Sequence, residues 1–157
     1  MIYILTAMQR EADALGVPCR VTGIGAKDLP ETTEEDVLVN VGYCGAVEIN
    51  PGTVVEPDEG ASYETGEGRM LGTHFNVLHV PCFTAERFVT EPCSVFPSVY
   101  DMELGKIMAL PHRELYVLKI VSDNLDEADC EAFEDEAAWE QVRALLIGKG
   151  LIEKRLD

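Results

Sequence analysis

A chain of 157 residues is long enough for one domain with a single substantial core, and its 46% hydrophobic content excludes a disordered protein. Its formal net charge of −17, from 29 acidic and 12 basic residues, would repel DNA, RNA and anionic membrane surfaces, so none of these is expected as a partner. No apolar run reaches the roughly 18 residues that a membrane-spanning helix needs.

Cysteine and histidine usage indicates a reduced protein without a metal site. The five cysteines form no CxxC pair, and four of them lie in or beside apolar runs, where cysteine behaves as a small hydrophobic residue. The three histidines lack the spacing of metal ligands. The chain starts with an apolar run and reaches an acid at Glu11 without a basic region, unlike a signal peptide. We therefore expect a cytoplasmic protein that uses no cofactor.

The first third of the chain predicts two strong strands with a short helix between them. Continuous apolar residues over 2–7 indicate a buried strand, and the spacing of apolar residues over 9–15 indicates a short helix. A weaker strand is expected over 19–24. The sequence DVLVNVG over 36–42 predicts a second buried strand, and the YCGA that follows over 43–46 is expected to be flexible.

The middle of the chain predicts shorter elements. A short strand is expected over 53–56, followed by an acidic, glycine-bearing surface loop over 56–68. A third apolar strand is expected over 75–81, and a short extended segment over 95–100. The apolar spacing over 102–110 is that of a helix.

The last third predicts a fourth strong strand over 114–122 and an amphipathic helix over 131–146. Strands thus alternate with helices, and the best strands are apolar throughout. This pattern predicts an α/β fold: one three-layer domain over 1–157, with a central, largely parallel (mixed) sheet covered on both faces.

Three carboxylates follow three different predicted strands. They are Glu11, Glu103 and Asp123, and the aromatic Phe88 follows a fourth strand. Ligands of open α/β sheets bind at the carboxyl ends of the strands, so these side chains are candidates for one site. A flat base joined to a sugar would suit them, because carboxylates assist cleavage of a glycosidic bond by acid–base transfer and stabilise its oxocarbenium-like transition state.

Each candidate also has a simpler structural interpretation. Glu11 can cap a helical turn, Asp123 can be a turn or capping residue, and Asp101 is expected to cap a helix or face outward. Met102 and Phe88 are the types of residue that usually belong to a core. The glycines of VNVGYCGAV form neither GxGxxG nor a P-loop, so they are weak evidence for phosphate binding.

The ordered set of segments resembles the nucleoside phosphorylase superfamily, in particular the methylthioadenosine/S-adenosylhomocysteine nucleosidases. The similar segments are MIYILTAMQREADAL, TGIGAK, DVLVNVGYCGAVEINPGTVVEPDE, TAERFV, VYDMELGKIMAL and LKIVSDN. The chain resembles a shortened form of that family, with few residues between Leu15 and Cys19 and a reduced region over 57–75. Tyr43 and Cys44 stand where the family usually has small residues.

The resemblance implies a role for each candidate. Glu11 would be the catalytic base, and Asp123 would protonate a purine at N7. Glu103 would bind the 2′ and 3′ hydroxyls of the ribose. The other residues implied at the substrate site are Met102 beneath the ribose, Phe88 stacked on the base, and Gly42, Tyr43 and Ser122 in the pocket. The resemblance also implies a homo-oligomer, either a dimer or a hexamer.

Hydrolysis is the expected reaction, with a purine-type nucleoside as the small-molecule substrate. A phosphorylase needs cationic groups to hold phosphate, and the candidates for this are Arg10 and Arg87. Glu11 directly follows Arg10, and an acid there suits water activation and would repel phosphate. Two alternatives remain open from the sequence. One is a phosphate-dependent phosphorylase, and the other is an inactive nucleoside-binding or interaction module of the same fold.

Overall fold

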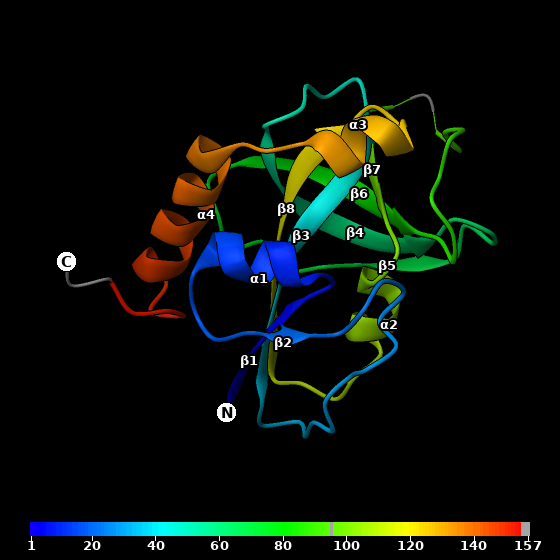
Figure 1. Cartoon of the computed structure of the whole chain (residues 1–157). Helices are drawn as coiled ribbons and strands as arrows, with labels where there is room; N and C mark the ends of the chain where they lie inside the picture. The colour runs from blue at the N-terminus through cyan, green and yellow to red at the C-terminus, as the bar shows by residue number, and fades with distance from the viewer. Residues whose placement is uncertain (95, 155–157) are drawn as a thin grey trace.

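The computed structural model describes residues 1–94 and 96–154. These residues form eight strands and four helices (Figure 1). Strands and helices do not alternate regularly as the sequence predicted, because six strands follow one another among the described residues between Arg20 and Asp101 without a helix. In chain order they are β1 (Ile2–Thr6), α1 (Gln9–Leu15), β2 (Arg20–Val21), β3 (Val37–Val47), β4 (Val54–Ser62), β5 (Gly68–Met70), β6 (Leu78–Thr84), β7 (Ser98–Asp101), α2 (Leu104–Met108), β8 (Glu114–Asp123), α3 (Glu127–Ala132) and α4 (Glu136–Gly148).

All eight described strands belong to one mixed sheet, which confirms the α/β prediction. Parallel pairs are β1 with β2 and β3, β3 with β8, and β6 with β4 and β7. Antiparallel pairs join β3 to β7, and β4 to both β5 and β8. The strands β3, β7, β6, β4 and β8 therefore pair in a closed ring, so the sheet is not the open layer that a three-layer sandwich implies.

The two edges of β3 explain how the chain positions its strand ends. Strand β8 pairs along one edge of β3 from Val37 to Gly45. On the other edge, β1 pairs with the first half of β3 and β7 pairs antiparallel with residues 45–47. Strands β1 and β7 thus run toward each other, and their carboxyl ends meet beside the middle of β3. The segments that follow β1 and β7 are brought together in this way.

Two segments expected to be loops are strands. The YCGA segment, expected to be flexible, is the second half of β3, because β8 and β7 pair with it on both edges. The acidic segment over 56–68, expected as a surface loop, supplies most of β4, which pairs with β6 and β5. The third apolar strand lies over Leu78–Thr84, a few residues later than expected.

The predicted helices are only partly right. Helix α1 has the predicted bounds, whereas α2 begins at Leu104 rather than at residue 102. The single helix expected over 131–146 is two helices, because the chain is extended at Phe133 and Asp135. The Asp135 carboxylate accepts a hydrogen bond from Ala138 N and so begins α4. Of the extended segment expected over 95–100, residue 95 lies outside the described residues.

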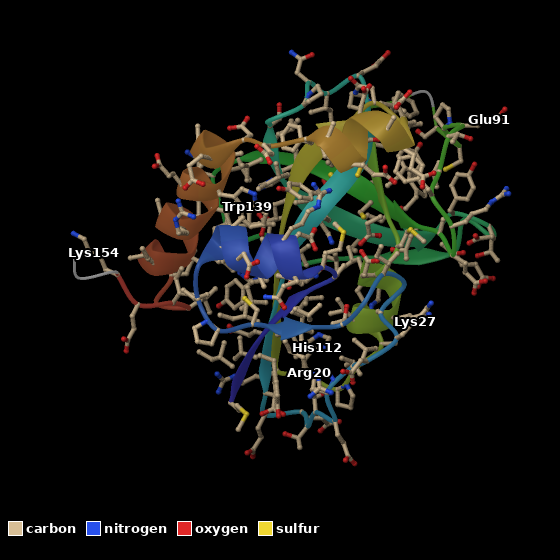
Figure 2. All side chains as sticks on the ribbon, viewed as in Figure 1. Arg20, Lys27, Glu91, His112, Trp139 and Lys154 are labelled. Atoms are coloured by element: carbon tan, nitrogen blue, oxygen red, sulfur yellow. The ribbon has the colours of Figure 1, made fainter. Side chains whose placement is uncertain are left out.

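Alternate residues of the central strands pack into two different clusters. On β8, Leu118 and Ile120 face α4 and join a cluster with Trp139, which Figure 2 shows between α4 and the sheet. Val117 and Val121 point the opposite way, into a cluster enclosed by β3, β4, β6, β7 and α2. Lys119 lies between Val117 and Val121 in the same alternation along β8, so its side chain also points to the inside of the closed ring.

Candidate active site

A cavity of about 280 Å³ lies where the ends of β1, β7 and β8 meet the middle of β3. Six of the eight residues predicted for the site line it: Glu11, Tyr43, Phe88, Met102, Glu103 and Asp123. The other two, Gly42 and Ser122, lie directly behind lining carboxylates and do not line the cavity themselves. The structure therefore brings together side chains that are up to 112 positions apart in the sequence (11 to 123).

Glu11 is a buried carboxylate held by three backbone N–H groups. Its Oε1 accepts hydrogen bonds from Ala7 N at 3.0 Å and Met8 N at 2.9 Å, and its Oε2 accepts one from Tyr43 N at 2.7 Å. Capping of α1 accounts for the first two bonds but not for the third, which comes from β3. Burial raises the pKa of Glu11, and the hydrogen bond from Tyr43 N partly offsets that rise.

Gly42 provides the space in which the Glu11 carboxylate lies. A Cβ atom at Gly42 would lie 2.7 Å from Glu11 Oε2, which is closer than van der Waals contact allows. A side chain at this position of β3 would therefore displace the carboxylate. Gly42 positions Glu11 by having no side chain.

Glu103 precedes α2 and reaches across to the loop after β2. Its Oε2 accepts a hydrogen bond from Gly25 N at 2.8 Å, and Lys106 Nζ donates to Gly25 O at 2.7 Å. Gly25 has a φ of 83°, which favours glycine. Burial, together with the nearby Asp101 carboxylate, raises the pKa of Glu103 to about 7. Glu103 therefore changes its charge near neutral pH.

Asp123 ends β8 and is held by the turn that follows. Its Oδ2 accepts hydrogen bonds from Leu125 N at 2.9 Å and Asp126 N at 3.2 Å, as the turn interpretation predicts. Its Oδ1 accepts a hydrogen bond of 2.6 Å from the Ser122 hydroxyl, so Ser122 orients the carboxylate from behind. Burial raises the pKa of Asp123. An acid with a raised pKa is suited to donate a proton near neutral pH.

Asp101 is not the outward-facing acid that the sequence suggested. It does accept a hydrogen bond from Leu104 N at 2.8 Å at the start of α2, but it is buried and forms an ion pair of 3.1 Å with Lys119. Burial would raise the pKa of Asp101. The Lys119 ammonium, together with the hydrogen bonds from Thr84 and Leu104 N, outweighs burial and lowers that pKa. Burial would in turn lower the pKa of Lys119, and the carboxylates of Asp101 and Glu103 reverse the effect and raise it.

The charge of the cavity wall is strongly negative. Six carboxylates line it, from Glu11, Asp101, Glu103, Asp123, Glu127 and Glu131, and Arg10 is the cation among the described lining residues. The Arg10 guanidinium donates to backbone carbonyls of Cys130, Glu131 and Phe133, so its hydrogen-bonding capacity is largely used. Arg87, the other predicted phosphate ligand, is exposed and does not line the cavity.

Comparison with known proteins gives no match by sequence and clear matches by structure. No family model and no curated protein sequence matches the chain. A variant of the methylthioadenosine/S-adenosylhomocysteine nucleosidase (MTAN) from Chlamydia trachomatis, solved with methylthioadenosine (MTA) bound, matches with a TM-score of 0.73 at 12% identity, over 96% of this chain and 98% of that one. Futalosine hydrolase of Helicobacter pylori matches with a TM-score of 0.67 at 14% identity, over 94% and 97% of the two chains. The chain has the fold of these nucleosidases.

A third match is the 5′-methylthioadenosine/S-adenosylhomocysteine nucleosidase of Helicobacter pylori, with a TM-score of 0.67 at 12% identity, over 94% of this chain and 97% of that one. The resemblance inferred from the sequence is thus confirmed at the level of the fold. Each match spans nearly the whole of both chains. Among the described residues no helix is long and apolar enough to cross a membrane, and no group of side chains could hold a metal ion.

Sequence reasoning missed several residues of this nucleosidase-fold cavity. Ile24 and Cys130 line it, and the Asp101–Lys119 pair lies at its inner wall. Lys119 carried a signal in the sequence, because a lysine inside the apolar run LYVLKIV must find a buried partner. Cys130 carried no such signal, since its place depends on how α3 packs. Arg10 was predicted as a phosphate ligand, and its contact with the end of α3 was not.

Proposed function

We propose that the chain is a nucleosidase that hydrolyses the N-glycosidic bond of a purine-type nucleoside. The observation that carries this proposal is the convergence of Glu11, Glu103 and Asp123 on one cavity of about 280 Å³ beside Phe88 and Met102. Three buried carboxylates in different surroundings can take three different roles. The fold shared with known nucleosidases supports the same assignment.

The proposed reaction uses a different acidic side chain for the base, for the water molecule and for the ribose. Asp123 donates a proton to N7 of the base while the bond between the base nitrogen and C1′ breaks and its electron pair leaves with the base. Glu11 accepts a proton from a water molecule, whose oxygen bonds to C1′. The ionised Glu103 accepts hydrogen bonds from the ribose hydroxyls. Met102 would lie beneath the sugar and Phe88 would stack on the base.

The charge of the cavity favours water over phosphate as the nucleophile. The wall is rich in acidic side chains, which disfavours a phosphate dianion even with Asp123 protonated and Asp101 paired with Lys119, and the Arg10 guanidinium is already bonded to carbonyls. No observation favours the phosphorylase alternative. The substrate class stays a purine-type nucleoside. We further propose a homo-oligomer in a reducing cytoplasm, where the five cysteines, all of them described, would remain the free thiols that the structure shows.

The test is release of free base from a panel of nucleosides with and without phosphate. The panel includes methylthioadenosine, S-adenosylhomocysteine and futalosine, because matched structures are named for these compounds or bind one of them. We expect base release in phosphate-free buffer. Release only in the presence of phosphate would replace the proposal with a phosphorylase, and no release in either buffer would leave an inactive binding module.

Two carboxylate variants test whether the reaction takes place in this cavity. We expect Glu11→Gln and Asp123→Asn each to lower kcat by about 10²- to 10⁴-fold, the usual contribution of a general acid or base. Asp13→Asn is the matched control, because Asp13 is an exposed acid on α1 whose recorded side-chain partner is Gln9. Steady-state kinetics with the hydrolysed nucleoside gives the result. Wild-type kcat in Glu11→Gln or in Asp123→Asn would show that the reaction does not use that carboxylate.

A further inference from the structure

The guanidinium of Arg10 is directed toward the end of α3. Nη2 donates a hydrogen bond of 3.0 Å to Cys130 O, and Nη1 lies 3.4 Å from both Glu131 O and Phe133 O. The guanidinium carbon also lies 4.7 Å from the centre of the Tyr43 ring. One side chain of α1 therefore connects α3 with β3 at the wall of the cavity.

Helix α3 depends on contacts of this kind. Its six residues are too few for a helix that is stable alone, and none of their side chains, all of them described, is buried. Glu127, Asp129 and Glu131 give it three negative charges, and its last turn contains no basic residue. The carbonyls at its carboxyl end carry the negative end of the helix dipole. An arginine at that end supplies both the missing charge and the missing donors.

Helix α3 is also a wall of the cavity. Glu127, Cys130 and Glu131 line it, and the turn that leads into α3 holds the Asp123 carboxylate through its backbone N–H groups. Arg10 itself is the neighbour of Glu11 on α1. The contact between Arg10 and α3 thus links α1, which carries the proposed base Glu11, to the helix that follows the proposed acid Asp123.

We propose that Arg10 is a positioning residue that closes α3 over the cavity and holds the walls carrying Glu11 and Asp123 at a fixed separation. This role rests on the proposed nucleosidase function. With Arg10 in place, α3 covers the base of the substrate and keeps water out of that side of the cavity. Without it, α3 moves away, and the substrate loses one wall of its site.

The movement of α3 can be measured without any substrate, from the alkylation rate of Cys130. We expect Arg10→Met to speed the reaction of Cys130 with iodoacetamide by about tenfold, which corresponds to losing about one hydrogen bond to a charged group. Peptide mass spectrometry resolves each cysteine, and the exposed Cys93 is the internal reference, with an unchanged rate. Burial raises the pKa of the Cys130 thiol and Arg10 partly offsets this. Loss of the Arg10 charge alone would therefore slow alkylation, so a faster reaction reports the opening of α3.

Two further variants make the result specific. Arg143→Met is the matched control, because Arg143 Nη1 donates to Ala14 O at 2.6 Å near the end of α1 but does not line the cavity. It should leave the Cys130 rate unchanged. Arg10→Lys keeps the charge but not the planar fork of donors, so we expect an intermediate rate. If the buried Cys44 and Cys82 also react faster in Arg10→Met, that variant is unfolded and the comparison rests on Arg10→Lys. The proposal is overturned if Cys130 reacts at the wild-type rate in Arg10→Met or, where that variant is unfolded, in Arg10→Lys.

Kinetics separate this proposal from the proposed function. With a nucleoside that the wild type hydrolyses, Arg10→Met should raise KM and lower kcat, while Arg143→Met changes neither. Wild-type kinetics in Arg10→Met, together with fast alkylation of Cys130, would contradict the positioning role and leave the nucleosidase intact. A wild type that hydrolyses no nucleoside would refute the function, while the alkylation rates would still report whether Arg10 holds α3.

Discussion

At the scale of single residues, the structural and functional interpretations of the three acids hold together. Glu11 caps α1 through Met8 N, yet its other oxygen is bound by Tyr43 N from β3. Asp123 orders its own turn, yet it is buried at the cavity wall. Glu103 precedes α2 but makes no cap bond with its side chain, and binds Gly25 N instead. The hydrogen bonds that fix these acids near the strand ends therefore also hold their carboxyl groups at the cavity wall.

Glu103 should make the protein less stable as the pH rises, because a buried carboxyl group with a raised pKa favours its neutral form. The stabilisation is present below the ordinary pKa of 4.5 and is lost as the pH rises through about 7. From pH 5 to pH 8, we expect the free energy of unfolding of Glu103→Gln to rise by roughly 2–3 kcal/mol relative to that of the wild type. Urea unfolding at the two pH values measures this gain.

The exposed Glu34 provides the control for this measurement, since Glu34→Gln removes an acid that lies at the surface. Its stability difference from the wild type should be nearly the same at pH 5 and pH 8. If Glu103→Gln behaves in the same way as Glu34→Gln, the Glu103 carboxyl group does not titrate in the folded protein as the structure indicates. Glu103→Gln should also lose affinity for a nucleoside, because the amide replaces one acceptor oxygen with an NH₂ group that can only donate.

At the scale of elements, the site depends on how closely α1 approaches β3. Gly42→Ala places a Cβ 2.7 Å from Glu11 Oε2, so we expect the carboxylate to leave Tyr43 N and kcat to fall by about 10²-fold or more. Gly148→Ala is the matched control, because a Cβ at Gly148, near the end of α4, meets no atom within 4 Å. Circular dichroism verifies that both variants are folded. Wild-type kcat in Gly42→Ala would contradict the role assigned to Glu11.

The elements differ in how well the sequence predicts them. The bounds of α1 were predictable because apolar spacing and the following Gly16 are local signals. The length of β3 was not, because residues 43–46 are held in a strand by partners at Tyr100 and Val121, far away in sequence. The break between α3 and α4 was also missed, since the apolar spacing runs through Phe133 without interruption. Tertiary pairing decided each of these cases.

At the scale of the whole molecule, the closure of the sheet into a ring was the feature that the sequence did not predict. The ring closes through a short pairing of Val54 with Ile120 and Val55 with Lys119. Nothing in the local sequence marks these positions as partners. The same closure turns Lys119 inward to meet Asp101. The apolar run around Lys119 indicated a buried partner, but the identity of that partner depends on the ring. The three acids were predictable because each lies at the end of its strand or within five residues of it.

The charge of the whole molecule also bears on the proposed reaction. A net charge of −17 and an acidic cavity wall disfavour phosphate near the sugar, so water should be the nucleophile. The most direct test is to run the reaction in ¹⁸O-labelled water with phosphate present. The account predicts one labelled oxygen in the released sugar and a base without label. A sugar phosphate without label, or no cleavage of any nucleoside offered, would contradict it.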